Sequence, residues 1–459
     1  MMIEPFFCPQ LTTASRFVSV RRRTLDLCKE LTAEDMMVQS CPEASPAKWH
    51  LAHTAWFFES FILTEFLPGY KLFNPEYPWL FNSYYRSFST FPEKRLRASF
   101  SRPGLDEVLR YRAHVDEAVE RLLTTDPPAE AVRRIEMGAN HEEQHQELLL
   151  TDILHAFYTN PLRPAYLDGQ SGLEFATDTP ALDFQEFPGG LCEIGHEGDS
   201  FCYDNEEPRH RVWLEPYALA TRLATCGEFA DFIAEGGYMR PELWLSDGWD
   251  AVEKNHWRAP LYWSLDPQVS QSDPQGDRSG PKCGENNWKI FTLRGEFCLQ
   301  QMANVPVSHV SFYEADAFAR WAGRRLATEL EWEVATSPDS SKGAMQNPTQ
   351  GNLLDAGLLM PAGASAGGMT QQFGDCWEWT SSAYLGYPGY TALNGSLGEY
   401  NGKFMSGQMV LRGGSCITPN PHIRSTYRNF FPPATRWQFS GIRLAKASGT
   451  PRRRIQLKP

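Results

Sequence analysis

Residues 140–154 read NHEEQHQELLLTDIL, and this stretch decides how the first part of the chain folds. Residues four apart lie on the same face of a helix, so His141 and His145 present two imidazoles to one side. The surrounding residues 127–158 are predicted to form one long helix. Both histidines can ligate one ion there, and the nearby carboxylates can orient the imidazole rings.

Three further helices are predicted in the N-terminal part of the chain. They cover residues 14–33, 46–66 and 103–125, where apolar residues recur at helical spacing. One long connection, residues 67–102, joins the second of these to the third. The pattern predicts a four-helix bundle over residues 1–160, an architecture that builds metal sites from inward-facing side chains.

A second pair of histidines lies in the predicted helix 46–66, within WHLAH at residues 49–53. His53 is one turn from Trp49 and from Phe57, on the apolar stripe that should face inward. We therefore predict His53 as the third ligand, with His50 as the less favoured candidate. Imidazole ligands suit iron, zinc and copper, so the ligand type leaves the metal open.

Two other interpretations of the histidine pair remain open. His141 and His145 can lie on a polar, solvated helix face without binding an ion. The pair also matches HExxH, in which Glu142 would be the general base of a zinc hydrolase. That pattern lacks a third ligand nearby, because no HxxGxxH extension follows and the next glutamate after Glu147 is Glu174.

The pattern of the chain changes after a predicted linker at residues 161–185. Over residues 186–446, short strand-like runs (210–214 and 410–412) alternate with turns, and two segments (225–236 and 313–323) have helical spacing. The stretches 240–300 and 338–375 are long and irregular, and such loops are often functional. The sequence predicts a multidomain α+β protein whose second domain has little regular secondary structure, with a basic tail at 447–459.

Composition excludes several classes of partner. The net charge of −13 argues against nucleic acid and against an anionic membrane. No apolar run approaches the roughly 18 residues that span a bilayer. The N-terminal stretch lacks the long apolar region of a signal peptide, and none of the ten cysteines forms CxxC. We expect mostly reduced thiols in a cytoplasmic protein.

Motifs in both halves carry a resemblance to known families. WHLAHTAWFFE and HEEQHQELLLTDIL resemble the DinB-like bundle. The second half resembles the formylglycine-generating-enzyme (sulfatase-modifying factor) domain, a C-type-lectin-like fold. Its matching stretches are NEEP at 205–208 with His210, PVSHVS at 306–311, RLATE at 325–329, EWE at 331–333, WEWT at 377–380, RGGS at 412–415 and GIR at 441–443. This fusion resembles the EgtB-like hercynine oxygenases, the sulfoxide synthases of ergothioneine biosynthesis, over nearly the whole chain.

The resemblance implies a non-haem Fe(II) cofactor held by His53, His141 and His145. It implies O₂-dependent C–S bond formation between a thiol and the imidazole C2 of hercynine (Nα-trimethylhistidine), with oxidation to the sulfoxide. True formylglycine-generating enzymes carry a cysteine pair shortly after the RGGS-type motif. Only Cys416 follows that motif here, which argues against copper–thiolate chemistry.

Several residues receive roles from this resemblance. Tyr84 and Tyr85, in NSYYR at 82–86, are predicted as a proton relay near the iron, and Asn82 of the same segment as a substrate contact. A trimethylammonium group favours an aromatic pocket. We expect hercynine to be contacted by Gln144, Asn429 and Phe430. The alternative for Tyr84 and Tyr85 is that they are packed aromatic side chains without a catalytic role. The alternative for Gln144 and Asn429 is that they are ordinary polar residues.

The thiol substrate is predicted from one position at which this chain differs from the γ-glutamylcysteine-using relatives. Relatives that use γ-glutamylcysteine carry RNWD where this chain has RNFF at 428–431, so Phe431 replaces a carboxylate that would pair with the glutamyl ammonium group. We therefore predict cysteine, with γ-glutamylcysteine as the alternative. Arg97 and Lys94 are candidates to bind the carboxylate of the cysteine substrate. The alternative is that both are solvated surface residues. An ovothiol-type synthase and a non-catalytic or sugar-binding fusion remain as rivals.

Overall fold

A computed structural model describes residues 12–167, 173, 175–265, 288–337 and 348–448. The chain divides into two compact units. Unit 1 comprises Met1–Tyr166 and Asn394–Tyr400, and unit 2 comprises Leu167–Leu393 and Asn401–Pro459. The predicted domain limits at 160 and 185 stay predictions. Residues 449–459 of the predicted basic tail, with Arg452–Arg454, lie outside the described residues, as do parts of the two predicted irregular stretches.

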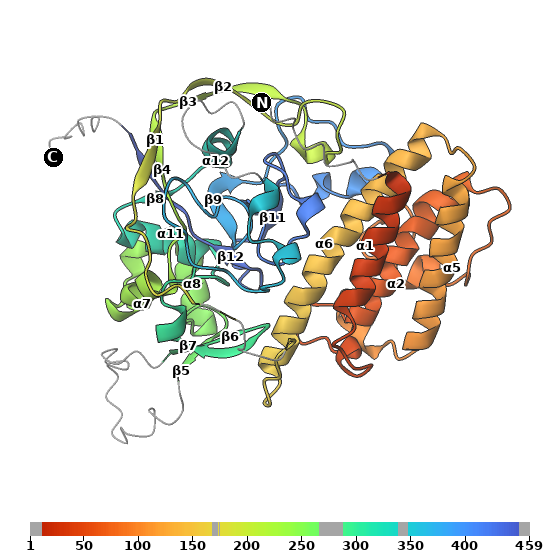
Figure 1. The fold of residues 1–459 in the computed structure, drawn as a ribbon, viewed down its shortest axis with the longest axis horizontal. Helices are drawn as coiled ribbons and strands as arrows, with labels where there is room; N and C mark the ends of the chain where they lie inside the picture. The colour runs from red at the N-terminus through yellow and green to blue at the C-terminus, as the bar shows by residue number, and fades with distance from the viewer. Residues whose placement is uncertain (1–11, 168–172, 174, 266–287, 338–347, 449–459) are drawn as a thin grey trace, which may run out of the picture. The chain divides into compact units, whose positions relative to one another are not determined.

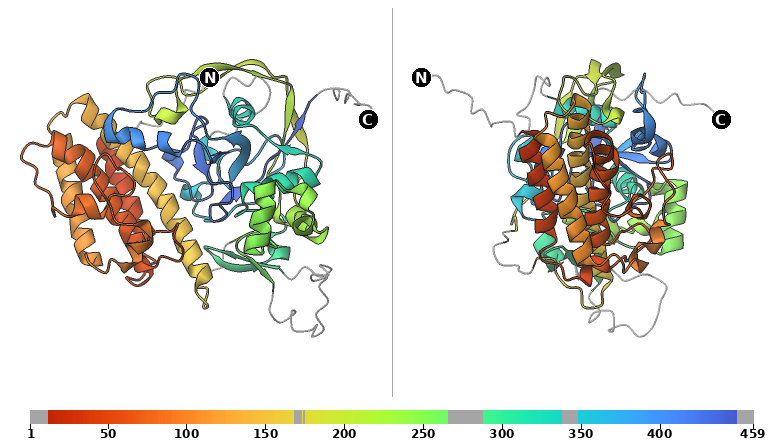
Figure 2. Two further views of the ribbon diagram at one scale, coloured as in Figure 1. Left: turned by 180° about the vertical axis from the view of Figure 1, so that it is seen from behind. Right: turned by 90° about the vertical axis from the view of Figure 1, so that its right-hand side faces the viewer.

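Unit 1 is helical, and its four longest helices among the described residues match the four predicted ones. They are α1 (Thr13–Leu27), α2 (Ala47–Phe58), α5 (Leu105–Leu123) and α6 (Ala129–Thr159). Figures 1 and 2 show them lying side by side. The shorter elements of the unit are η1 (Asp35–Met37), η2 (Glu59–Leu63), α3 (Thr64–Phe66), α4 (Tyr77–Leu80), η3 (Lys94–Ser99) and η9 (Gly395–Glu399).

Two predicted helix limits differ from the structure. The first helix ends at Leu27 rather than near residue 33, with Cys28 as its C-cap. Pro46 is the N-cap of α2 and not its first helical residue. The predicted continuous helix over 46–66 instead passes through a π-helical segment, Glu59–Leu63, before the short helix Thr64–Phe66. A π segment adds a residue to the turn and re-aims the side chains that follow it.

The position of α2 explains its composition. Every residue of α2 is buried, and the helix packs against both α5 and α6. A helix that is buried all round needs no polar face. On α6, Gly138 allows the close approach of α2, because a Cβ at this position would come within 2.6 Å of Cε1 of Phe58. This packing brings the middle of α2 against the middle of α6.

Unit 2 is built from short strands and short helices. Its sheets, among the described residues, have the strand orders β1-β4-β13-β8, β11-β10-β9-β12, β2-β3 and β5-β6-β7. The strands are β1 (Phe184–Phe187), β2 (Gly190–Ile194), β3 (His210–Leu214), β4 (Tyr217–Ala220), β5 (Trp263–Leu265), β6 (Trp288–Thr292), β7 (Gly295–Cys298), β8 (Arg325–Leu326), β9 (Trp377–Ala383), β10 (Met409–Arg412), β11 (Asn429–Phe431), β12 (Ser440–Gly441) and β13 (Leu444–Ala447).

Several helices of unit 2 begin at capping boxes. Capping boxes of a threonine or serine with a glutamate three residues later start α7 (Cys226–Ala234), α11 (Phe312–Trp321) and α12 (Glu329–Thr336). The remaining helical elements are α8 (Ser246–Asn255), α10 (Leu299–Met302), η4 (Asp204–Glu206), η5 (Gly237–Met239), η6 (Pro241–Leu243), η7 (Pro348–Gln350), η8 (Leu354–Ala356), η10 (Gly402–Phe404) and η11 (Asn420–His422).

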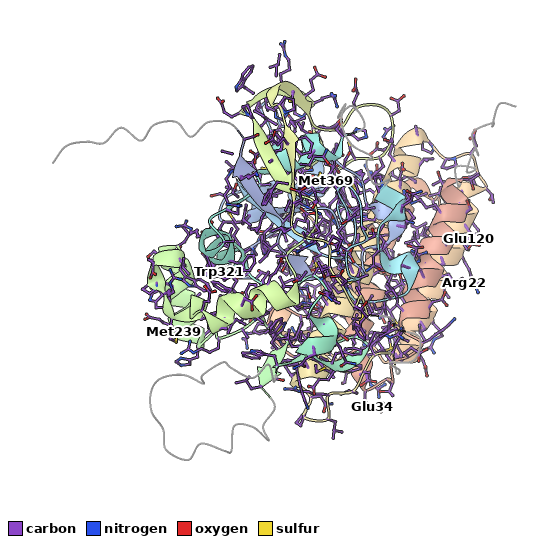
Figure 3. All side chains as sticks on the ribbon, turned by 60° about the vertical axis from the view of Figure 1, so that its left-hand side comes forward. Arg22, Glu34, Glu120, Met239, Trp321 and Met369 are labelled. Carbon is purple, nitrogen blue, oxygen red and sulfur yellow. The ribbon has the colours of Figure 1, made fainter. Side chains whose placement is uncertain are left out.

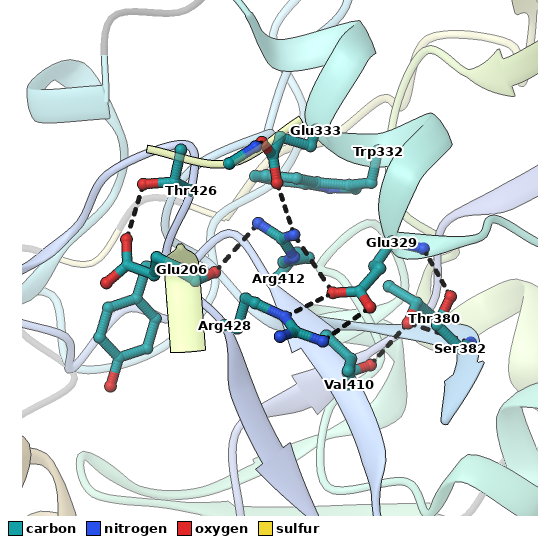
Figure 4. Close-up of polar contacts among 12 residues, drawn as sticks. Glu206, Glu329, Trp332, Glu333, Thr380, Ser382, Val410, Arg412, Thr426 and Arg428 are labelled. Atoms are coloured by element: carbon teal, nitrogen blue, oxygen red, sulfur yellow. Dashed lines mark hydrogen bonds and ion pairs between the residues drawn. The ribbon is translucent and has the colours of Figure 1, made fainter. Parts of the chain in front are cut away.

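The interior of unit 2 combines apolar packing with buried ion pairs. One apolar cluster joins β1, β3, β4, β13 and α12 around Tyr217 and includes Met369, which is labelled in Figure 3. Figure 4 shows the main ionic network, in which Arg412 contacts Glu333 at 2.7 Å and Glu329 at 3.2 Å, and Arg428 pairs with Glu329 at 2.9 Å. Pairing and hydrogen bonding offset the cost of burying these charges.

Candidate metal centre

Three histidines from two helices meet inside unit 1. His53 is on α2, and His141 and His145 are one turn apart on α6. Each offers one ring nitrogen, and these three nitrogens all lie within 4.8 Å of one another. The ring centroids are separated by 5.1 Å (His53–His141), 4.7 Å (His53–His145) and 4.6 Å (His141–His145). The three residues singled out from sequence therefore form one cluster with the donors that a metal ion requires.

Burial keeps these imidazoles neutral. Desolvation lowers the pKa of His141 to about 3, and it lowers the pKa of both His53 and His145 well below the usual value, with further repulsion from the neighbouring histidines. A neutral imidazole has a lone pair to give to an ion, whereas an imidazolium has none. The site therefore needs no deprotonation before it can bind a metal at neutral pH.

The tautomer of His53 is set by a backbone contact. Its Nδ1 donates to the carbonyl oxygen of Phe81 at 2.6 Å, and its Nε2 is buried without a hydrogen-bond partner. Metal-binding histidines usually donate their second ring N–H to a carbonyl or carboxylate in this way. A buried, unpaired nitrogen is costly unless something binds it, so the residues present fit a metal ion.

His50 acts on this cluster indirectly. Its Nε2 lies 3.0 Å from a carboxylate oxygen of Asp152, and its Nδ1 lies 2.8 Å from Nδ1 of His145. Desolvation lowers the pKa of His50, so its ring is neutral. With its one proton on Nε2 and donated to Asp152, its Nδ1 must accept the Nδ1–H of His145. That arrangement leaves Nε2 of His145 with the lone pair.

Aromatic side chains hold the rings in place. Trp49 and Trp56 stack on the two faces of His53, with ring centroids at 4.4 and 5.1 Å and interplanar angles of 13° and 15°. Phe57 lies 4.6 Å from the ring of His141. These three aromatic residues come from the same helix as His53, which explains why α2 carries them at this spacing. The imidazoles cannot turn away without breaking this packing.

Glu142 does not belong to the cluster. Its carboxylate accepts from Thr24 at 2.5 Å and is paired with Arg21 at 2.8 Å and with Arg112. These three partners are buried on α1 and α5. Although desolvation opposes it, the two arginines lower the pKa of Glu142, so the carboxylate is ionised and occupied. This disfavours the HExxH hydrolase, which needs Glu142 as a general base beside the metal.

A tyrosine that the sequence did not single out lies beside the histidines. Tyr400, in the 394–400 segment of unit 1, has its ring 5.7 Å from that of His141 and 6.4 Å from that of Tyr84. Tyr84 in turn stacks on Tyr85 at 4.5 Å, with 3.4 Å between their hydroxyl oxygens. Burial raises the pKa of Tyr84. Nothing in the spacing of residue 400 predicts this contact, because it joins segments more than 250 residues apart.

The segment that carries Tyr84 is fixed by further contacts within unit 1. The backbone N–H groups of Arg86 and Ser87 donate to the carboxylate of Glu399 at 3.1 and 2.8 Å. Asn82, predicted to contact substrate, uses its amide inside this loop. Its Nδ2 donates to the carbonyl of Tyr85 at 3.0 Å, and its Oδ1 accepts from the N–H of that residue at 3.1 Å. Its role towards a substrate stays a prediction.

The other predicted contacts lie in different surroundings. Arg97 is buried, with its guanidinium 3.4 Å from the ring centroid of Trp49 and a 2.8 Å bond to Ser45, and burial lowers its pKa to about 9. Burial also lowers the pKa of Lys94. Arg97 is therefore not simply solvated, whereas the side chain of Lys94 is exposed. Gln144 is half-buried on α6 between His141 and His145.

Asn429, Phe430 and Phe431 belong to strand β11 of unit 2. The ring of Phe430 stacks on Tyr384 at 3.9 Å, and Phe431 packs edge-on against Trp437 at 5.1 Å. The Oδ1 of Asn429 accepts from the backbone N–H of Phe430. Their roles in binding a substrate stay predictions.

Comparison with known proteins identifies the family. Residues 16–150 match the DinB superfamily, and residues 176–448 match the Sulfatase-modifying factor enzyme 1-like domain family. The chain is 31% identical over 451 residues to a hercynine oxygenase of Mycobacterium tuberculosis, covering 94% of this chain and 98% of that protein. The chain belongs to the hercynine oxygenase family. The hercynine oxygenase of Mycolicibacterium smegmatis is 30% identical to this chain, and the match covers 95% of this chain and 98% of that protein.

Membership in this family confirms the predicted α+β fold class, with a helical DinB-type part followed by a sheet-containing part. A formylglycine-generating enzyme of Streptomyces coelicolor is 27% identical, but it covers only 50% of this chain, in keeping with a likeness to the second part alone. No helix among the described residues is both long and apolar enough to span a membrane. The eight cysteines in the described part of the chain are free thiols. Cys8 and Cys283 lie outside it.

Proposed function

We propose that this hercynine oxygenase relative holds one Fe(II) through His53, His141 and His145. In this proposal the protein joins a thiol to the imidazole C2 of hercynine with O₂ and oxidises the product to the sulfoxide. The observation that carries the proposal is the cluster of three buried, neutral imidazoles within 4.8 Å of one another. Relatives that are named hercynine oxygenases match almost the full length of the chain.

The overall reaction balances without a further reductant. Forming the C–S bond removes two electrons, one hydrogen from the thiol and one from imidazole C2. Oxidation of sulfur to the sulfoxide removes two more electrons. One O₂ accepts all four electrons and yields the sulfoxide oxygen and one water. Bound Fe(II) would activate O₂ and favour the thiolate form of the sulfur substrate.

Three histidine ligands leave room for substrates, since iron accepts more than three ligands. The side chains around the cluster suit this task. Stacking of Trp49 and Trp56 on His53 fixes the ligand geometry, and the Asp152–His50–His145 chain fixes which nitrogen faces the ion. Because the imidazoles are buried, water is kept from their lone pairs. Aromatic surroundings also favour a quaternary ammonium group such as that of hercynine.

Proton movement is the second requirement. Loss of the C2 proton and reduction of O₂ need a group that holds or delivers a proton near the ion. We propose that Tyr400 is that group and that Tyr84 and Tyr85 continue from it. Their rings contact one another in series, and Tyr400 contacts His141. The raised pKa of Tyr84 keeps its hydroxyl protonated and able to donate.

Cysteine is proposed as the thiol donor. The support is Phe431, which stands where the resemblance to γ-glutamylcysteine users would require an aspartate. Its ring packs against Trp437 and offers no charge to a glutamyl ammonium group. Arg97 is a candidate for the cysteine carboxylate, because its buried guanidinium keeps only one side-chain partner, Ser45, among the hydrogen bonds of the described residues.

The test is reconstitution of the full chain with Fe(II) under anaerobic conditions, followed by O₂, hercynine and a thiol. We expect O₂ consumption and a product with the mass of hercynylcysteine sulfoxide. γ-Glutamylcysteine should react more slowly, and Phe431→Asp should shift the preference towards it. If neither thiol gives an adduct, the proposed function is wrong. If only γ-glutamylcysteine reacts, the thiol assignment alone is wrong.

A further inference from the structure

A second group of potential metal ligands lies in unit 2, in the loop that joins β2 to β3. His196, Cys202 and Glu207 each contribute one donor atom, and these three atoms lie within 4.8 Å of one another. The three residues fall within twelve positions of the chain, so the loop itself brings them together. They are one imidazole, one thiol and one carboxylate, a donor set distinct from the three histidines of unit 1.

The loop is held firmly from its inner side. Figure 4 shows the carboxylate of Glu206 bonded to the hydroxyl of Thr426, at 2.6 Å, and the same carboxylate pairs with Arg424, whose Nε lies 2.8 Å away. The N–H of His196 donates to the carbonyl of Glu206 at 2.9 Å. The N–H of Gly195 donates to Glu333 at 2.7 Å. A binding site needs such support, because loose ligands lose affinity.

The three donors are not committed elsewhere. His196 is only 8% exposed, and its Nδ1 is buried without a hydrogen-bond partner. Its other nitrogen, Nε2, lies 2.9 Å from the hydroxyl of Ser200, which fixes the ring orientation. Cys202 is a free, half-buried thiol. While Arg424 neutralises Glu206, the described residues include no ion pair to Glu207.

We propose that His196, Cys202 and Glu207 bind a thiophilic divalent cation of the Zn²⁺ class, with solvent in the fourth position. Sulfur, imidazole nitrogen and carboxylate oxygen are the donors that zinc prefers. Tetrahedral zinc at its usual bond lengths sets neighbouring ligand atoms roughly 3.3–3.8 Å apart. The loop therefore needs only a small contraction to close around the ion. Binding releases the thiol proton to solvent and cross-links the loop between β2 and β3.

The site is tested with Co²⁺ added to the metal-free full chain. A thiolate ligand gives Co²⁺ an intense near-ultraviolet charge-transfer band, which a three-histidine site cannot produce. We expect this band in the wild type and in His141→Ala, where the other cluster is disabled. It should disappear in Cys202→Ser, and Glu207→Gln should weaken Co²⁺ binding at least tenfold. Because Glu207 is exposed, the second variant should fold even if the first does not.

Cys192→Ser is the matched control, since Cys192 is a half-buried thiol on the adjacent strand β2. It should keep the charge-transfer band. Absence of the band from the wild type would overturn the proposal, as would a band that survives Cys202→Ser or that is lost equally in Cys192→Ser. A band that disappears in His141→Ala would also overturn it, because the sulfur would then belong to the other centre.

Discussion

Glu142 and His141 are neighbours on α6, but helical geometry turns their side chains about 100° apart. His141 faces α2 and the histidine cluster, whereas Glu142 faces α1 and α5, where Arg21, Arg112 and Thr24 bind its carboxylate. The glutamate therefore contributes to the stability of the bundle. It orders the helix that carries His141 and His145.

Replacing this carboxylate should destabilise the protein. In Glu142→Gln, the buried guanidinium of Arg112 loses its counter-charge and that of Arg21 keeps only Asp116. We expect a loss of about 3–5 kcal/mol in the free energy of unfolding. Glu143→Gln is the matched control. Its partner Arg16 is 18% exposed and can be resolvated, so its loss should be smaller. Denaturant unfolding measures both. A Glu142→Gln protein as stable as the wild type yet inactive would favour a general base.

Tyr400 is the residue through which we expect the proton to pass. Tyr400→Phe keeps the ring against His141 but removes the hydroxyl, so product formation should fall by roughly 10²–10⁴-fold, the usual contribution of a general acid or base. Fe(II) affinity should be unchanged. Tyr70→Phe removes a hydroxyl bonded to Glu59 elsewhere in the bundle and should leave the rate per folded molecule unchanged. An unaffected rate in Tyr400→Phe would contradict the assignment.

At this scale, only part of the site follows from the sequence. The i, i+4 spacing identified His141 and His145, and the apolar neighbours of His53 favoured it over His50. The contact of His50 with His145 and Asp152 depends on how two helices rotate against each other, which spacing on one helix does not specify. Tyr400 was missed because its contact is made by long-range folding.

At the scale of elements, the close approach of α2 and α6 brings His53 to His141 and His145. A methyl group at Gly138 would meet the ring of Phe58, which is fully buried against Phe17 and Arg21. Replacing this glycine by alanine gains roughly 1 kcal/mol of helix propensity. Overpacking costs about 1–3 kcal/mol, so we expect Gly138→Ala to lower the free energy of unfolding by up to about 2 kcal/mol.

A double variant separates the clash from other causes. Phe58→Leu removes the ring atoms that the new methyl group would meet, so Gly138→Ala should cost less in that background than in the wild type. Denaturant unfolding of the four proteins gives the coupling energy. If Gly138→Ala lowers the free energy of unfolding equally in both backgrounds, the contact with the ring of Phe58 is not the cause of the loss.

The long helices were predictable because their apolar periodicity extends over many residues. The π segment Glu59–Leu63 was not, since it continues a helical pattern without interruption. Most strands of unit 2 have two to five residues. Such runs are too short to show alternation between apolar and polar residues, so only β3 and β10 were identified from the sequence. The helices α7 and α11 were identified by their helical spacing.

At the scale of the whole molecule, the buried histidines make stability depend on pH. The unfolded chain protonates a histidine near pH 6.5, but the native pKa of His141 is depressed to about 3. Between these values the unfolded state binds more protons, so the free energy of unfolding falls as the pH drops below 6.5. The slope is about 1.4 kcal/mol per pH unit for each such histidine.

This slope is measured on the metal-free protein by denaturant unfolding between pH 7 and pH 5. We expect a shallower dependence in His141→Asn, which removes one titrating group. His256→Asn changes an exposed histidine in a left-handed conformation that asparagine also adopts, so its slope should match that of the wild type. A slope that is unaltered in His141→Asn would show that this histidine is not held neutral.

The equilibrium affinity for Fe(II), measured anaerobically on the wild type, His53→Ala and His50→Ala, tests the three-histidine centre most directly. His50 only orients His145, and loss of such a partner costs about 10–100-fold in metal affinity. Loss of His53 removes a ligand and should cost more than that. Wild-type affinity in His53→Ala, or a larger loss in His50→Ala than in His53→Ala, would contradict the assignment of His53, His141 and His145 as the iron ligands.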